Sequence, residues 1–81
     1  MSIDRDAFVG NVKEAFDVPD ADMNLETEFQ RLEQWDSLAS VSTVAMVYEH
    51  YDVQISGDEL VGCRTVGDIL TLVEQRRAVE A

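Results

Sequence analysis

Apolar residues recur at helical spacing near the start of the chain and predict a helix that ends close to Phe16. The apolar stripe of this helix consists of Phe8, Val12, Ala15 and Phe16. Ser2 is the expected N-cap, while Asp4 and Asp6 suit the positive end of the helix dipole. Pro19, which stands among acidic residues, is expected to end the helix and to begin a long polar connection.

That connection carries apolar residues at irregular intervals, as expected of a loop that packs over helices. These anchors are Val18, Met23, Leu25, Phe29, Leu32 and Trp35. Oxygen-bearing side chains alternate at Asp20, Asp22, Asn24 and Glu26. A calcium loop that began at Asp20 would need a turn glycine where Leu25 stands and a bidentate glutamate where Arg31 stands. We therefore expect a solvated acidic loop with no metal site beyond weak surface binding of divalent ions.

A second helix is expected from Asp36 or Ser37 to about Tyr51. Asp36 suits the N-cap, since its carboxylate can accept a hydrogen bond from a free first-turn amide. Ser37 then lies where exposed amides and the helix dipole favour a phosphate ester, which makes it a candidate attachment site. On a helical wheel the apolar residues form one edge of Val44, Val47 and Tyr51 and an adjoining edge of Leu38, Val41, Ala45 and Tyr48. Periodicity alone does not decide which edge is buried.

Residues 52–57 break the helical pattern, and Val53 and Ile55 predict a short extended segment that plugs into the core. A short third helix is expected to begin at Ser56 or Gly57, to run through Val61 and to stop at Gly62.

Thr65 and Asp68 form a variant capping box for a final helix. The apolar face of that helix is Val66, Ile69, Leu70 and Val73. Arg76 and Arg77 suit the negative end of its dipole, and residues 78–81 are expected to fray.

Together these elements predict an all-α fold, a small four-helix bundle of three main helices and one short helix with a long first loop. The chain has no internal repeat and no linker, so residues 1–81 are expected to form a single domain. It starts with Met1 and stops just beyond the final helix, which favours a free-standing protein over a fragment of a larger enzyme.

Composition narrows the classes of function. A chain of 81 residues has room for one modest core and none for a deep catalytic pocket, so a carrier or an adaptor is favoured over an enzyme. Six Lys and Arg residues against 17 Asp and Glu residues give a net charge of -11, which argues against nucleic acid as a partner. No apolar run is long enough to span a membrane, and no targeting segment is recognisable, so a cytoplasmic protein is expected. We also expect a monomer.

The residues available for catalysis point the same way. His50 is the single histidine, and thirteen residues of helix place it roughly 20 Å along the axis from Ser37, too far to act as its base. One histidine and one cysteine leave no zinc site. Cys63 stands near Val61 and Val66, which predicts a small buried hydrophobic residue.

The motif Asp36-Ser37-Leu38, at the start of the middle helix of a short acidic chain, resembles the attachment motif of acyl carrier proteins. The order and approximate lengths of the helices and loops are similar to that family across nearly all of the chain. The resemblance implies that 4'-phosphopantetheine from coenzyme A is attached covalently to Ser37, with Asp36 and Leu38 beside it. It also implies a phosphopantetheinyl transferase and acyl-loading and acyl-processing enzymes as partners, and no turnover by this chain.

The resemblance further assigns the two edges of the motif helix. The edge of Val44, Val47 and Tyr51 would face the bundle, whereas the edge of Leu38, Val41, Ala45 and Tyr48 would be exposed and would dock partner enzymes. The alternative is that this second edge is ordinary core.

The chain departs from familiar fatty-acid carriers because acids do not follow the motif directly, and Glu49 is the first acid of the helix. This favours a carrier for a dedicated fatty-acid-like, polyketide or secondary pathway. A discrete peptidyl or aminoacyl carrier stays open, since the same prosthetic group can carry an amino acid. So does an acidic helical adaptor without a prosthetic group, which would bind a partner through the same apolar edge.

Overall fold

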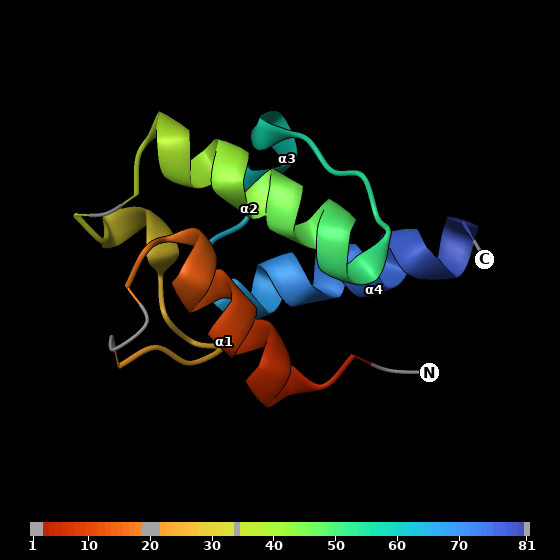
Figure 1. Cartoon of the computed structure of the whole chain (residues 1–81), viewed down its shortest axis with the longest axis horizontal. Coiled ribbons are helices and arrows are strands. Elements are labelled where there is room, and N and C mark those ends of the chain that lie inside the picture. The colour runs from red at the N-terminus through yellow and green to blue at the C-terminus, as the bar shows by residue number, and fades with distance from the viewer. Residues whose placement is uncertain (1–2, 19–21, 34, 81) are drawn as a thin grey trace.

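A side-chain cap marks the start of each α-helix of the fold. The computed structural model describes residues 3–18, 22–33 and 35–80, the last three only as helical backbone. Its elements in order are α1 (Arg5–Ala15), the 3-10 turn η1 (Phe29–Arg31), α2 (Ser37–Tyr51), α3 (Gly57–Val61) and α4 (Val66–Glu80). The described part of the chain contains no strand, which confirms the all-α prediction. In Figure 1, α1 and α4 lie on one side of α2, and α3 lies on the other.

The N-cap of α1 is Asp4, so the prediction of Ser2 was wrong. Asp4 has an extended backbone, and its carboxylate accepts a hydrogen bond from the Ala7 amide at 3.0 Å. Starting the helix at Arg5 places Ile3 just before the cap and Phe8 four residues into the helix, the spacing of a hydrophobic staple. Both side chains belong to the core, which favours this start. Ser2 itself lies outside the described residues.

The residue that follows the C-cap of α1 has a left-handed backbone conformation. Phe16 is the C-cap, and Asp17 has φ of 60°, which lets the Val18 amide donate to the Lys13 carbonyl at 2.9 Å. Pro19, which the sequence indicated as the end of the helix, lies outside the described residues.

The long loop packs over the helices as predicted. Met23 and Phe29 are buried, while Val18, Leu25, Leu32 and Trp35 are partly buried against the core. The Phe29 ring meets the Trp35 ring edge-on, with centroids 4.8 Å apart. The loop also satisfies amides at the start of α4, because Val66 donates to the Thr27 carbonyl and Gly67 donates to the Leu25 carbonyl.

α2 is the central helix, since it contacts α1, α3 and α4. The face that it buries consists of Ala39, Thr43, Met46 and Val47. Sequence reasoning identified Val47 but missed the other three. Thr43 is fully buried although it is polar, because its hydroxyl donates to the Ala39 carbonyl one turn earlier at 2.8 Å.

The second half of the fold contains the predicted extended segment and the predicted helices. Val53 and Ile55 are buried in extended backbone, and Ser56 with Glu59 forms a capping box for α3. The amide of Asp68 donates to the Thr65 hydroxyl at 3.2 Å, while the Thr65 amide donates to the Asp68 carboxylate at 3.1 Å. This pair is the predicted variant box at the start of α4.

The end of α4 differs from expectation. Residues 78–80 continue the helix, because neither glycine nor proline follows Arg77 to interrupt it; Ala81 lies outside the described residues. Arg76 does more than complement the dipole, since its guanidinium forms an ion pair with Glu59 of α3 and donates to the Gln54 carbonyl at 2.8 Å.

Candidate functional site

Ser37 is the first residue of α2 and is exposed. The cap beside it is Asp36, whose Oδ1 accepts a hydrogen bond from the Ala39 amide at 2.8 Å. The Ser40 amide donates to the Asp36 carbonyl at 3.0 Å, the first backbone hydrogen bond of the helix. Because Asp36 supplies the cap, the Ser37 hydroxyl is not needed for it.

The local backbone suits an anionic substituent on that hydroxyl. The amides of Ser37 and Leu38 precede the first intrahelical hydrogen bond and lie at the positive end of a 15-residue helix. A phosphate ester on Ser37 would therefore be attached where helix amides and dipole favour negative charge. The exposed serine and this helix end fit a phosphate-linked prosthetic group.

A shallow hollow of about 300 Å³ lies beside Asp36, between the end of α1 and the start of α2. Its lining consists of Ala15, Phe16, Asp17, Asp36, Leu38, Ala39 and Ser42. The charged groups of this lining are the carboxylates of Asp17 and Asp36.

The edge of α2 that includes Leu38 is exposed. Leu38, Val41 and Tyr48 are 72%, 66% and 56% exposed, and Ala45 is exposed as well. On the other edge, Val47 is fully buried, while Val44 and Tyr51 are packed against the core. The division between a bundle-facing and an exposed edge is therefore the one that the resemblance implied, and the alternative that the second edge is core was wrong.

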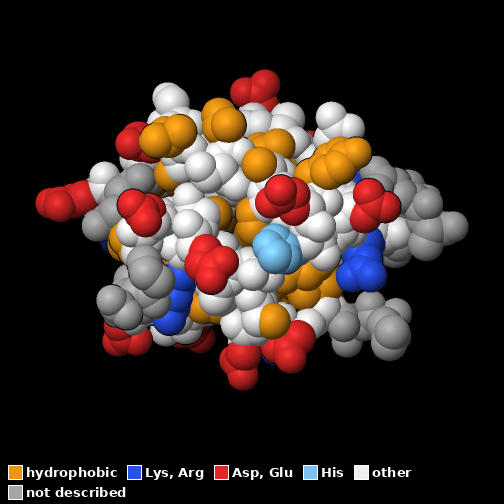
Figure 2. Space-filling view, in the orientation of Figure 1, with side chains coloured by type: hydrophobic (Ala, Val, Ile, Leu, Met, Phe, Trp, Pro, Cys, Tyr) orange, Lys and Arg blue, Asp and Glu red, His pale blue; other side chains and the backbone are white. Residues whose placement is uncertain are grey.

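Val61 of α3 is a further exposed apolar residue, and sequence reasoning missed its exposure. It is 67% exposed, and α3 packs against α2, where the Ser40 hydroxyl would lie 3.2 Å from a Cβ on Gly57. A five-residue helix is too short for periodicity to indicate its exposed side. Figure 2 shows hydrophobic side chains gathered on the upper part of the molecule, over α2 and α3.

The other candidate groups lie away from Ser37. His50 is exposed in the last turn of α2. Cys63 is buried, and desolvation, followed by the nearby carboxylates of Asp68 and Glu59, raises the pKa of its thiol, so the thiol stays protonated. Within the described ranges, no group of three or more histidine, cysteine or acidic residues could hold a metal ion.

None of the helices in the described part of the chain combines the length and the apolar character needed to cross a membrane.

Comparison with known proteins agrees with this geometry. A family model described as a phosphopantetheine attachment site matches residues 6–73. An acyl carrier protein homolog from Mycoplasmopsis pulmonis (strain UAB CTIP) is 42% identical over 41 residues, which are 51% of this chain and 56% of that protein. The chain thus spans just over half the length of this curated relative.

A solved structure is similar over more of the chain. The solution structure of a holo acyl carrier protein from Geobacter metallireducens is 27% identical, with a TM-score of 0.73 over 93% of this chain and 86% of the other. The family match, the helical fold and the exposed serine agree with one another. The chain belongs to the family of phosphopantetheine attachment domains, as an acyl-carrier-type domain for covalently attached phosphopantetheine.

Proposed function

We propose that Ser37 is the attachment residue and that the chain carries acyl groups as thioesters on the phosphopantetheine arm. The observation that supports this most is an exposed serine, next to a capping aspartate, as the first residue of the central helix. The arm would supply a terminal thiol that holds the acyl group in an activated form.

The protein's own residues have simpler tasks in this proposal. Asp36 holds the start of α2 in place, so that Ser37 reaches a phosphopantetheinyl transferase in a fixed geometry. The exposed side chains of Leu38, Val41, Ala45 and Tyr48 form a docking edge for the transferase and for enzymes that load or process the acyl group. A tethered arm then raises the effective concentration of the cargo at each docked enzyme.

The proposed pathway is a dedicated fatty-acid-like, polyketide or secondary one. The first two turns of α2 hold no acid, and Glu49 is the first acid along the helix. Partners that recognise this helix would therefore rely more on apolar contact than on charge. We further propose that residues 1–81 act as a single monomeric domain in the cytoplasm.

The aminoacyl alternative differs only in the cargo. It shares the arm, the attachment residue and the docking edge, so it is distinguished by which loading enzymes accept the protein.

Loading tests whether the arm on Ser37 carries a thioester. The protein is incubated with an acyl-coenzyme A, magnesium and a promiscuous transferase, and its intact mass is measured before and after neutral hydroxylamine. We expect one acyl-phosphopantetheinyl addition and loss of the acyl group alone under hydroxylamine, because thioesters are cleaved while the phosphodiester survives. An adduct that resists hydroxylamine would contradict thioester carriage, and Ser37→Ala provides the unmodified control.

A further inference from the structure

Three aromatic rings form a cluster beside the start of α2. Trp35 immediately precedes the first turn and its cap, and the centroid of its ring lies 4.8 Å from that of Phe29 and 5.4 Å from that of Phe16. The rings of Phe16 and Phe29 are 6.1 Å apart, so all three pairs lie in the range of aromatic contact. We propose that Trp35 is a positioning residue for the attachment reaction, which holds the first turn of α2, and with it Ser37, in one place on the fold. The role rests on the proposed function, since Ser37 is taken as the attachment residue.

The partners of Trp35 belong to two different parts of the fold. Phe16 is the C-cap of α1, while Phe29 begins the 3-10 turn η1, and both side chains are buried. Trp35 itself is only partly buried, so its ring packs on the two phenylalanine rings from the outside of the core. One side chain thereby joins the entry of α2 to both α1 and the long loop.

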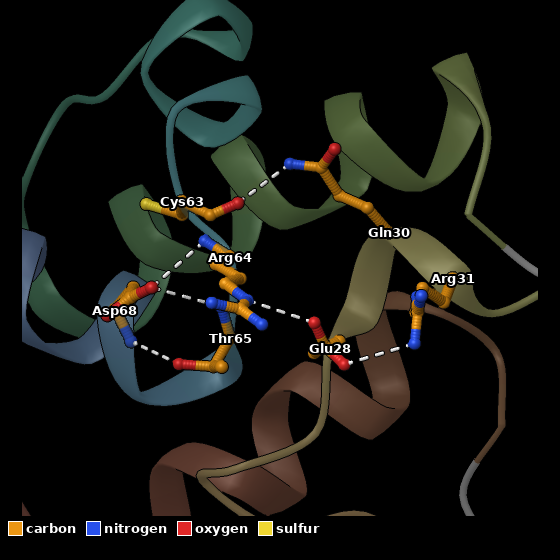
Figure 3. Close-up of polar contacts among 7 residues, drawn as sticks. All are labelled: Glu28, Gln30, Arg31, Cys63, Arg64, Thr65 and Asp68. Atoms are coloured by element: carbon orange, nitrogen blue, oxygen red, sulfur yellow. Dashed lines mark hydrogen bonds and ion pairs between the residues drawn. The ribbon is translucent and has the colours of Figure 1, made fainter.

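Phe29 is fixed by the contacts of its two neighbours. The Glu28 carboxylate accepts a hydrogen bond from the Arg64 guanidinium at 3.0 Å, and the Gln30 side chain donates to the Cys63 carbonyl at 2.7 Å. Figure 3 shows both contacts, which reach from the long loop to the connection between α3 and α4. The indole ring therefore packs against a loop that is tied to the second half of the chain.

The hydrogen bonds described for the entry of α2 are local. The Trp35 amide donates to the Leu32 carbonyl at 3.1 Å. The carboxylate and the carbonyl of Asp36 accept from the amides of Ala39 and Ser40. These bonds fix the shape of the turn and of the cap, but they join residues of one short segment. The place of that segment on the bundle therefore depends on side-chain packing.

Packing at the first turn of α2 offers few other anchors. Ser37 is exposed and Leu38 is 72% exposed, while Ala39 is buried but contributes a single methyl group. The next buried side chain of the helix is Thr43, one turn further along. Trp35 is therefore the largest side chain that holds this end of the helix against the bundle.

Transfer requires the Ser37 hydroxyl at one place. In the complex with the transferase, the serine oxygen forms a bond to the β-phosphorus of coenzyme A while the phosphoanhydride bond to adenosine bisphosphate breaks. The hydroxyl proton passes to a base of the transferase. A displacement of about 1 Å from the reacting geometry costs roughly 100-fold in rate. A first turn that moves relative to Val41 and Tyr48 would therefore slow the reaction while docking through these side chains is kept.

Amide hydrogen exchange tests the positioning role without the transferase. Trp35→Ala should speed exchange of the Ala39 and Ser40 amides about tenfold, because two ring contacts that hold the first turn are lost. Trp35→Phe, which keeps a ring, should stay within threefold of the wild type. The control is Val73→Ala, which removes packing at a fully buried position of α4 and should leave both exchange rates within twofold of the wild type.

Transfer kinetics supply the second readout. With coenzyme A, magnesium and a promiscuous phosphopantetheinyl transferase, intact mass gives the rate of modification at a series of protein concentrations. Trp35→Ala should lower kcat about tenfold and change KM less than threefold, since the docking side chains further along α2 are kept. Trp35→Phe should recover most of kcat, and Val73→Ala should match the wild type. Circular dichroism shows whether each variant is folded, and Trp35→Leu takes the place of Trp35→Ala if the alanine variant unfolds.

Two results would overturn the positioning role. One is a folded Trp35→Ala or Trp35→Leu whose kcat or Ala39 exchange rate lies within twofold of the wild type. The other is an equal loss of kcat in Val73→Ala, which would make the effect one of general stability. Modification of Ser37→Ala would instead contradict the proposed function, and the exchange comparison would still decide whether Trp35 holds the first turn.

Discussion

Asp36 and Ser37 have different roles at the start of α2. Asp36 turns its carboxylate back to the Ala39 amide and so satisfies the helix end, while Ser37, one residue later, keeps an exposed hydroxyl. A serine that had to cap the helix would use its hydroxyl for the backbone. The adjacent aspartate therefore leaves the serine free for chemistry, which is the physical sense of the Asp-Ser pair.

Removal of the cap should lower stability by a predictable amount. Asp36→Ala is expected to reduce the free energy of unfolding by about 0.5–2 kcal/mol, the usual cost of losing an N-cap hydrogen bond. Asp36→Asn, which keeps a side-chain oxygen, should retain most of the free energy that Asp36→Ala loses. Urea unfolding measures both. An unchanged free energy for Asp36→Ala would contradict the capping role. If transfer to Ser37 were lost in that stable variant, the carboxylate would act mainly in recognition by the transferase.

The carboxylates around the α3–α4 turn offer a second prediction for single residues. The Arg64 side-chain hydrogen bond, followed by the charge of Arg31, lowers the pKa of Glu28, whereas backbone amides of Arg64 and Thr65 are the main cause of the lowered pKa of Asp68. Arg64→Gln should therefore raise the pKa of Glu28 toward its ordinary value and move that of Asp68 much less. Carboxyl NMR titration measures both groups.

The sign of the pH dependence follows from these shifts. Both carboxyls have lower pKa values in the folded protein, so their stabilisation is present above the ordinary acidic range and is lost as the pH falls through the lowered values. Equal shifts of the two pKa values in Arg64→Gln would contradict the separation of side-chain and backbone causes.

Among the elements, the long loop links α3 and α4 through hydrogen bonds. Its backbone carbonyls at Leu25 and Thr27 accept hydrogen bonds from the first-turn amides of α4. Its Gln30 side chain donates to the Cys63 carbonyl just after α3. Glycine at position 67 suits this close approach, because a Cβ there would lie 3.0 Å from the Leu25 carbonyl oxygen, a tight contact. Loop and helix are thereby fixed as one unit.

Two glycine substitutions test this contact. Gly67→Ala should lower the free energy of unfolding by about 1–3 kcal/mol, because a backbone carbonyl must move to admit the methyl group. Gly10→Ala, in the interior of α1 with open space around it, should raise that free energy by about 0.5–1 kcal/mol. Thermal or urea unfolding compares the two. If Gly67→Ala were as stable as the parent, the loop would not be held tightly against α4.

Sequence patterns predicted the elements better than their connections. Asp36 and the Thr65–Asp68 pair cap their helices as expected, because capping is local in sequence. The buried Thr43 was missed because its partner, the Ala39 carbonyl, is a backbone group that hydropathy does not reveal. The hydrogen bond from the Gln30 side chain to the Leu60 carbonyl was missed for a related reason, since it joins residues thirty apart and follows no periodicity.

The candidate site was likewise predicted where the signal lies within one helix and missed where it depends on packing between helices. Ser37 was predicted from the motif and from its place at the start of one helix, and the helical wheel gave the two apolar edges of α2. The resemblance to acyl carrier proteins, and not the wheel, indicated which edge is exposed. The exposure of Val61 depends on how α3 packs against α2, and no pattern within α3 carries that information.

For the whole molecule, charge and apolar surface are separated. The chain has a net charge of -11, yet the edge beside Ser37 exposes Leu38, Val41 and Tyr48 and carries no acid before Glu49. Overall charge can steer basic partners over a distance, whereas contact at the edge depends on apolar burial. Exposed ion pairs typically contribute roughly 0–1 kcal/mol, less than a buried anchor at about 2 kcal/mol or more.

Binding to pathway enzymes should therefore depend on Val41. Val41→Asp is expected to stay folded and to weaken binding by about 2 kcal/mol or more, while added salt weakens wild-type binding only modestly. Val47→Asp, a fully buried position on the same helix, should instead unfold the protein. Calorimetry measures the binding free energy, and circular dichroism shows whether each variant is folded. Steep salt dependence together with unchanged binding by Val41→Asp would shift the docking role to the acidic residues of the loop.

The central claim, attachment at Ser37, is tested most directly by intact mass after incubation with coenzyme A, magnesium and a phosphopantetheinyl transferase. We predict one phosphopantetheinyl addition to the wild type and to Ser40→Ala, which changes the serine one turn further along α2, and none to Ser37→Ala. Addition to Ser37→Ala, or loss of the addition in a folded Ser40→Ala, would contradict the assignment of Ser37 as the attachment residue.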